Sequence, residues 1–314
     1  MYSDPGLDYF EDLSKKTDFI RDTLEKPYRL ISILKDVSAT GALRSKLALK
    51  GGTAIQFIHM GIRRLSVDVD FNYIGSTEKG VMEAERAVIR DELSKIFQEH
   101  GYQFQGPRMR FSEEQFELKY INAIGNTDRL KVEINYSERL PVLDLKTMRL
   151  THPFNVLGDV TTESYVYEEV MAQKVRALVD RGTARDLFDV HQFLKKAHMD
   201  DRRLFRKLFL FYMCLNKPDV RKVNDEKIRA ITKMDVKQWL VPLLRRQDHG
   251  IDLEAMSAPV LEFVRVLIDF DKDERRFLDK FYDDGIFDQK LLFSDVPAIN
   301  DLSTHPMVQW RLRN

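Results

Sequence analysis

In the first hundred residues, apolar side chains recur at helical spacing in two long regions, and a short segment with a different pattern lies between them. Residues 9–35 predict a charged helix, and residues 36–45 continue it as helix and loop. Residues 78–100 predict a long amphipathic helix, because their apolar members keep near-helical spacing. Between the two regions, residues 47–60 predict a strand, a tight turn and a helix in succession.

A strand pattern follows in residues 102–136. The runs most typical of strands are 110–111, 116–120 and 130–136. Gly125 and Asn126, followed by Asp128, fit a hairpin connection between the last two runs. Residues 141–158 are punctuated by proline and glycine, which predicts a mostly irregular stretch.

The pattern changes again near residue 160, and from residue 167 onward almost every apolar cluster has helical spacing. We therefore expect an α+β protein with two lobes. Residues 1–160 predict an α/β lobe whose mixed sheet is flanked by helices, and residues 161–314 predict an all-helical lobe. No flexible linker separates the two patterns, so we expect closely packed lobes.

Composition restricts the class of protein. The chain has 314 residues, 43% of them hydrophobic, and its 50 basic and 50 acidic residues give a formal net charge of zero. A nucleic-acid partner would therefore be held by local patches rather than by a global field. The single cysteine, Cys214, lies in an apolar run, which excludes a disulfide framework within the chain and predicts a buried thiol. Without a signal-peptide pattern or an apolar run of membrane-spanning length, we expect a cytoplasmic monomer with no membrane partner.

Asp68 and Asp70 form the first candidate site. They lie in the predicted strand around residues 65–73, where alternation directs both side chains to one face. Two neighbouring carboxylates repel each other unless a cation or a proton compensates. Mg²⁺ or Mn²⁺ suits this need, since such ions take carboxylate oxygens together with substrate phosphates.

The turn formed by Lys50, Gly51, Gly52 and Thr53 is the second candidate site. It follows the apolar run 47–49 and precedes a predicted helix. Free amides and the dipole at a helix N-terminus favour a bound anion. Alone, each motif is more often a simple turn or a solvated strand face. Together and in this order they favour a metal-dependent phosphate site.

A third candidate lies in the helical part. Lys174 falls on or beside the apolar stripe of a helix predicted over residues 168–181, where an ammonium group is unusual unless it meets an anion. Asp186 and Asp189 share one face of the next helix, which begins near Ala184. The structural alternative is a salt-bridge network that closes a helical hairpin, with Arg181 or Arg185 paired to Asp186 or Asp189. Arg176 lies on the same pair of helices.

Taken in order, these motifs resemble the AbiEii/AbiGii-type nucleotidyltransferase toxins, a family of the polymerase-β-like nucleotidyltransferase superfamily. The stretches that carry the resemblance are 50–53, 64–71, 131–136, Glu169, 174–178 and 181–190. The resemblance covers residues 45–195, whereas residues 200–314 carry no matching motif. It implies a nucleotidyltransferase lobe, a helical lobe that carries the second half of the active site, and a cleft between them.

The resemblance also implies roles for single residues. Asp68 and Asp70 match the metal-binding pair, Lys174 the family's cleft lysine, and Asp186 its late acidic residue, which would orient or deprotonate the acceptor hydroxyl. Asp189 is a second acidic match, and Glu133 stands where many superfamily members have a third metal carboxylate. The residues expected to bind the nucleotide and its phosphates are Lys50, Gly51, Gly52, Thr53, Ser66 and Arg64.

By resemblance, the expected function is that of a bacterial toxin–antitoxin or abortive-infection toxin. It would move an NMP from an NTP onto the 3' end of tRNA, block translation and meet a cognate antitoxin. Basic residues that would contact RNA phosphates are Arg44, Lys46, Arg63, Arg64, Arg108 and Arg110, although scattered solvated charges explain them equally well. The alternatives are a nucleotidyltransferase for small, antibiotic-type molecules and a non-catalytic nucleotide-binding module.

Overall fold

The computed structural model describes residues 4–196, 201–216, 218–294, 296 and 299–313. These residues divide into two compact units. The first unit consists of Met1–Arg139, Leu145–Tyr165 and Pro242–His249. The second consists of Leu140–Asp144, Val166–Val241 and Gly250–Asn314.

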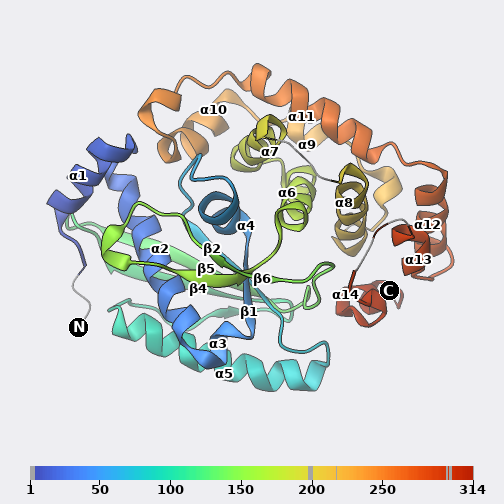
Figure 1. Ribbon diagram of the computed structural model, residues 1–314, viewed down its shortest axis with the longest axis horizontal. Coiled ribbons are helices and arrows are strands. Elements are labelled where there is room, and N and C mark those ends of the chain that lie inside the picture. Colours follow the sequence, from blue (N-terminus) through green and yellow to red (C-terminus); the bar gives the residue numbers. More distant parts are fainter. Residues whose placement is uncertain (1–3, 197–200, 217, 295, 297–298, 314) are drawn as a thin grey trace. The chain divides into compact units, whose positions relative to one another are not determined.

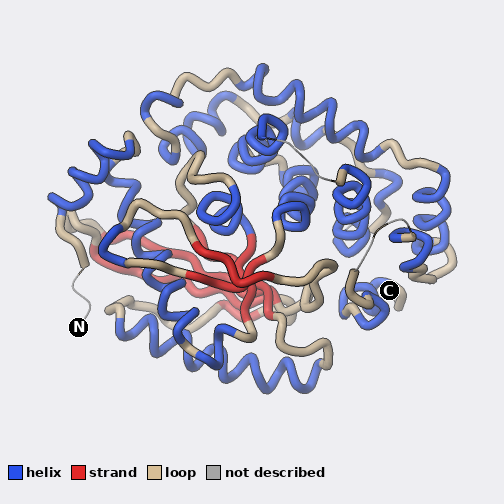
Figure 2. The backbone as a smooth tube through the Cα atoms, viewed as in Figure 1, coloured by secondary structure: helices blue, strands red, loops and turns tan. Residues whose placement is uncertain are grey.

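A seven-stranded mixed sheet organises the first unit (Figures 1 and 2). The strand order is β3-β4-β5-β2-β1-β7-β6; β2 is parallel to β5 and β1 to β7, and the other neighbours are antiparallel. The strands are β1 Leu47–Lys50, β2 Asp68–Tyr73, β3 Arg108–Met109, β4 Glu113–Ile121, β5 Thr127–Asn135, β6 Lys146–Arg149 and β7 Thr161–Ser164.

One face of this sheet is an apolar core. Leu118, Val132 and Ile134 of the central strands are each no more than 1% exposed, because every second residue turns to that face. Two long helices, α2 (Arg21–Ala39) and α5 (Lys79–Glu99), pack there (Figure 1). The opposite-facing residues of β2, β4 and β5 are polar except for Ile121 at the end of β4, and these strands therefore present a chemically distinct second face.

Contacts from α2 and α5 to strand β4 fix this packing. The α5 ring of Phe97 lies 5.2 Å from the Phe116 ring. From α2, the Arg29 guanidinium lies 4.1 Å from the centre of the Tyr120 ring. The remaining helical elements of this unit are α1 Leu7–Thr17, α3 Gly41–Arg44, α4 Gly51–Ala54, η1 Ile55–His59, η2 Asn155–Leu157 and η6 Arg246–Asp248.

All secondary-structure elements among the described residues of the second unit are helices, joined by loops (Figure 2). Its elements are α6 Tyr167–Arg181, α7 Ala184–Lys196, α8 Arg202–Asn216, η3 Val220–Lys222, α9 Glu226–Arg229, α10 Lys233–Asp235, η4 Val236–Leu240, α11 Leu253–Ile268, α12 Lys272–Tyr282, α13 Gln289–Phe293, η7 Leu302–Thr304 and α14 Pro306–Arg311. A further 3-10 turn, η5 Val241–Leu243, spans the change from the second unit to the first. None of the described helices is both long and apolar enough to cross a membrane.

Buried aromatic and charged contacts hold the helices of the second unit together. Phe193 of α7 stacks on Phe205 of α8 at 5.1 Å between ring centres. The Tyr212 hydroxyl of α8 donates to Glu169 of α6 at 2.5 Å. Cys214 is a buried free thiol, as its apolar surroundings in the sequence predict.

The α+β fold class with a mixed sheet and a helical C-terminal region is confirmed, and so are the helix at 78–100 and the hairpin that joins β4 to β5. Two local predictions are wrong. Residues 110–111 form the turn after β3, because the Arg110 amide bonds the Glu113 carbonyl. The helix predicted over 9–35 is two helices, because Asp18 adopts a left-handed φ of 63° where Phe19 forms a β-bridge with Arg245.

Candidate active site

The turn between β1 and α4 brings backbone against a carboxylate. Gly51 has a φ of +69°, and a Cβ atom there would lie 2.4 Å from Asp70 Oδ2. At Gly52 the added atom would lie 2.9 Å from Arg64 Nη2 and 3.1 Å from Ser66 Oγ. Only glycine permits both approaches, so the two glycines are required by the close packing of this turn on the site.

Buried hydroxyl groups fix the strand that follows. Thr53 Oγ1 donates to the Asp68 carbonyl oxygen at 2.5 Å and lies 2.9 Å from Ser66 Oγ. Thr53 is fully buried and Ser66 is 4% exposed. These contacts tie the segment before Asp68 to α4 and set where β2 begins.

Arg64 is also built into the site. It is 2% exposed, and its Nη1 donates to the Leu65 carbonyl oxygen at 2.9 Å. Gln56 Oε1 accepts from the amides of Arg63 at 2.9 Å and Arg64 at 3.1 Å. The apolar context of Gln56 in the sequence gave no sign of this role in shaping the loop.

Asp68, Asp70 and Glu133 lie on one face of neighbouring strands. Asp70 pairs with Glu133 of β5 in the sheet register, and Asp68 pairs with Lys131. Burial raises the pKa of the Asp70 carboxyl, and the charges of Asp68 and Glu133 raise it further, against the opposing effect of Lys131. Burial is the largest of these effects and the repulsion between the carboxylates adds to it, so a bound cation would favour the ionised form of Asp70.

This donor set fits a hard divalent cation. Two of the three carboxylates are the predicted metal ligands Asp68 and Asp70, and a cation would remove the repulsion that raises the pKa of Asp70. Among the described residues no group of three or more His, Cys, Asp or Glu side chains is arranged to hold a metal by itself. The fit is thus to an ion that takes part of its coordination from substrate phosphates and water.

Lysines surround these acids. Lys131 Nζ lies 2.8 Å from Glu133 Oε2. Lys50 Nζ lies 3.8 Å from Glu138 Oε2, and both side chains are largely buried. Lys131 was missed by the sequence analysis, although its alternate position in β5 placed it on the same face as Glu133.

The second cluster joins α6 and α7 in the helical unit. Lys174 Nζ lies 2.9 Å from Asp186 Oδ1 and 3.2 Å from Asp189 Oδ2, and all three side chains are buried. Arg181 Nε donates to Asp186 Oδ2 at 2.7 Å. Although burial alone would raise the pKa of Asp186, Lys174 and Arg181 hold that pKa well below its ordinary value.

The start of α7 reinforces this network. Thr183 Oγ1 donates to Asp186 Oδ2 at 2.7 Å, and the Asp186 amide approaches Thr183 Oγ1 at 3.3 Å. Gly182 takes a φ of +58° at the end of α6, where a Cβ atom would lie 2.2 Å from the Lys227 carbonyl oxygen. The Thr-x-x-Asp spacing is a capping pattern that would have identified Thr183 from the sequence. Arg185 lies in the first turn of α7 and is partly exposed.

The structure thus brings the predicted residues together in two sets. The first unit holds Lys50, Gly51, Gly52, Thr53, Arg64, Ser66, Asp68, Asp70 and Glu133. The second unit holds Lys174, Arg185, Asp186 and Asp189. A cleft between the two units stays a prediction.

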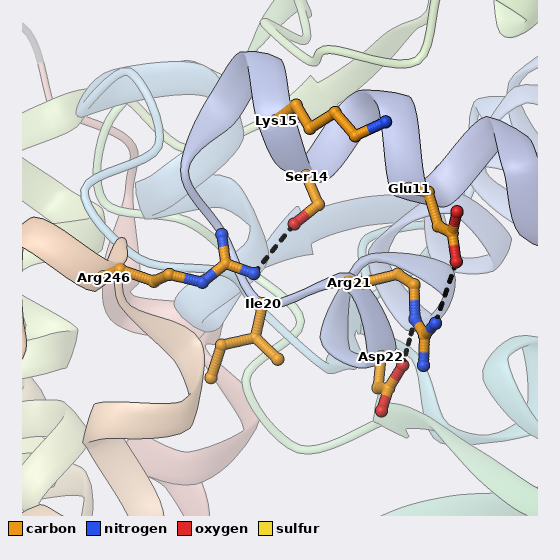
Figure 3. A pocket seen from close by; sticks show the side chains of 7 residues that line it. All are labelled: Glu11, Ser14, Lys15, Ile20, Arg21, Asp22 and Arg246. Carbon is orange, nitrogen blue, oxygen red and sulfur yellow. Dashed lines mark hydrogen bonds and ion pairs between the residues drawn. The ribbon is translucent and has the colours of Figure 1, made fainter.

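A surface cavity of about 430 Å³ in the first unit contains none of these residues (Figure 3). Its basic side chains are engaged by neighbours: Arg21 Nη1 lies 3.1 Å from Glu11 Oε1, and Arg246 Nη2 donates to Ser14 Oγ at 3.1 Å. The cavity is therefore a less suitable site for a nucleotide than the carboxylate face of the sheet.

The fold is similar to that of solved structures. Among them is MenT4, a nucleotidyltransferase toxin from Mycobacterium tuberculosis H37Rv, with a TM-score of 0.63 at 19% identity over 85% of this chain and 92% of that chain. No curated protein sequence matches the chain.

The model of the family described as nucleotidyl transferase AbiEii toxin, type IV toxin–antitoxin system, matches residues 32–274. The chain belongs to this family, and it is a nucleotidyltransferase of the toxin type.

Proposed function

We propose that this toxin transfers an NMP from an NTP to the 3' end of tRNA, releasing pyrophosphate and blocking translation. The single observation that carries the proposal is the approach of the Gly51 backbone to Asp70, which sets a helix start beside paired carboxylates. A phosphate-binding turn next to a metal-binding pair suits nucleotidyl transfer.

In this proposal, residues 1–160 bind the nucleotide and residues 161–314 complete the active site. The amides of Gly52 and Thr53 bind terminal phosphates, with Lys50, Arg64 and Ser66 nearby. Asp68 and Asp70 would hold Mg²⁺ or Mn²⁺, with Glu133 as an added acid, and the bound ion supplies charge neutralisation at the reacting phosphate. Positioning and charge stabilisation dominate catalysis of this class.

Lys174 offsets charge on the triphosphate, and its carboxylate partners fix where its ammonium lies. The lowered pKa of Asp186, caused by Lys174 and Arg181 against burial, favours this positioning role over deprotonation of the acceptor. Asp189 supports the same network through its contact with Lys174, and Arg185 lies in the first turn of the helix that carries both acids. The acceptor hydroxyl forms its bond to the α-phosphorus while the bond to the bridging oxygen breaks, and pyrophosphate leaves.

The family description, a type IV toxin–antitoxin system, supports an antitoxin partner. The proposal adds action in the cytoplasm and a role in abortive infection against phage. We propose a monomeric enzyme that the antitoxin neutralises.

The test is labelling of total tRNA. Purified protein is incubated with Mg²⁺ and each labelled NTP in turn, and the RNA is resolved on a gel. Label should enter tRNA with the intact protein and not with Asp68→Asn, whereas Asp91→Asn, on the exposed side of α5, should behave as the intact protein. Folded protein that labels no RNA with any NTP would reject the tRNA acceptor and leave a small-molecule acceptor or a non-catalytic nucleotide-binding module.

A further inference from the structure

Two basic side chains face each other on the polar face of the sheet. Lys119 of β4 pairs directly with Arg129 of β5. Both are exposed, the Arg129 side chain by 62%. Arg129 lies two residues before Lys131, and Lys131 pairs with Asp68, so strand alternation puts all these side chains on the face of the metal-binding pair.

This pairing is unfavourable by itself. Like charges directly opposite each other on neighbouring strands are destabilising. Arg129 Nη1 lies 3.2 Å from Glu117 Oε1, with both side chains more than half exposed, and exposed ion pairs of this kind contribute little. In the part of the chain that the structure describes, no ion pair involves the Lys119 ammonium. A bound anion would relieve the repulsion and occupy the free ammonium.

The position of Lys119 and Arg129 in the sheet indicates which substrate would supply this anion. With strands about 4.8 Å apart and residues about 3.3 Å apart, Arg129 lies about 8 Å and Lys119 about 12 Å from Asp68 along the sheet. The β1–α4 turn lies on the opposite side of β2, since the strand order is β4-β5-β2-β1. At a transferred phosphate, the attacking oxygen and the leaving oxygen lie roughly in line on opposite sides of the phosphorus. If the triphosphate binds on the β1 side of β2, the acceptor therefore approaches from the β5 side.

Arg108 extends the same surface to the edge of the sheet. It pairs with Gln115, which pairs with Glu133, so one row of partners runs from the exposed edge to Asp70. Arg108 is exposed, and no ion pair with a described residue involves its guanidinium. Arg108, Lys119 and Arg129 are exposed cations spread over three neighbouring strands. Separated cations of this kind suit a strand of phosphates rather than a single small anion.

We propose that Lys119, Arg129 and Arg108 bind the backbone phosphates of the RNA acceptor strand and position its 3' end over Asp68 and Asp70. This inference rests on the proposed function. The three are positioning residues: they contact phosphates remote from the reacting atoms, so they act on the affinity for RNA and on its salt dependence. The affinity for the NTP does not depend on them.

The experiment measures labelling of tRNA at several salt concentrations with Lys119→Gln/Arg129→Gln. The control is Lys16→Gln/Lys95→Gln, which removes the same charge from exposed positions in α1 and α5. The KM for RNA should rise about threefold to tenfold, with kcat at saturating RNA and the KM for NTP unchanged. The slope of log KM against log salt should fall by about 0.7 for each phosphate contact removed.

The outcomes separate the two proposals. If the intact protein labels RNA and the double variant matches its control in KM and salt slope, the phosphate surface is rejected while the proposed function stands. If kcat falls with KM unchanged, the pair does not act in RNA binding, and the inference is likewise overturned. If the intact protein labels no RNA with any NTP, the proposed function fails and this inference fails with it.

Discussion

Lys174 Nζ lies 2.9 Å from Asp186 Oδ1 inside the helical unit, where the side chains are 6% and 1% exposed. A buried ion pair contributes little net stability, but the loss of one partner leaves an uncompensated charge. The geometry therefore couples the predicted catalytic lysine to the stability of the helices that carry it.

Asp186→Ala should destabilise the protein by about 2 kcal/mol, because buried Lys174 keeps only Asp189 as a carboxylate partner and Thr183 loses its acceptor. Urea unfolding measures this change. The control is Asp180→Ala, which removes a partner of Arg176 from a pair that is 20% exposed on each side. That control should cost less than about 1 kcal/mol. Equal losses in the two variants would contradict a structural role for the Asp186 network.

Gly51→Ala tests the close approach to Asp70. Gly61 has nearly the same positive φ, +66° against +69°, but nothing lies within 4 Å of its added Cβ. Both substitutions should cost about 1 kcal/mol in backbone strain. Only Gly51→Ala should displace a carboxylate, and it should lower nucleotidyl transfer about 100-fold. Similar rates of nucleotidyl transfer in both variants would show that the contact between Gly51 and Asp70 is not needed for the reaction.

Asp68→Asn should remove a charge that raises the pKa of Asp70. A carboxyl whose pKa is raised by folding makes the folded protein less stable as the pH rises from the unfolded pKa through the folded pKa. The free energy of unfolding of the variant should therefore exceed that of the intact protein above about pH 4. The expected gain at pH 7 without metal is on the order of 1 kcal/mol. Urea unfolding at pH 4 and pH 7 measures it, and a gain already complete at the lower pH would argue against charge repulsion.

With Mg²⁺ present, the intact protein should become more stable than Asp68→Asn. A ligand that binds only the folded state stabilises it in proportion to the logarithm of its concentration. Thermal unfolding of the intact protein should therefore shift upward with Mg²⁺, while Asp68→Asn should respond weakly. An identical shift in both would place the bound ion elsewhere.

Cys214 should be inert in the native state. Burial raises the pKa of its thiol to about 12, so almost no thiolate exists near neutral pH. Iodoacetamide at pH 8 should leave the folded protein unmodified and label it stoichiometrically in urea, as mass spectrometry would measure. Fast labelling of the folded protein would contradict the packing around α8.

The local parts of the site were predictable because they follow from short-range geometry. Strand alternation alone puts Asp68 and Asp70 on one face, and the glycine pair marks the turn. The contact of Gly51 with Asp70 was not predictable, because it depends on the pairing of β1 with β2. The break at Asp18 likewise depends on Arg245, a residue far away in the sequence.

The segment Pro242–His249 belongs to the first unit although it follows most of the second in the chain. The Leu65 amide, next to Ser66, donates to the Leu243 carbonyl oxygen at 2.8 Å, and the Arg246 amide bonds the Asp18 carbonyl. During synthesis, a ribosome that has completed the whole sheet has not yet made these partners. The loop that precedes the metal-binding pair therefore obtains its last backbone contact late in translation, so the nascent toxin is incompletely assembled until most of its chain has been produced.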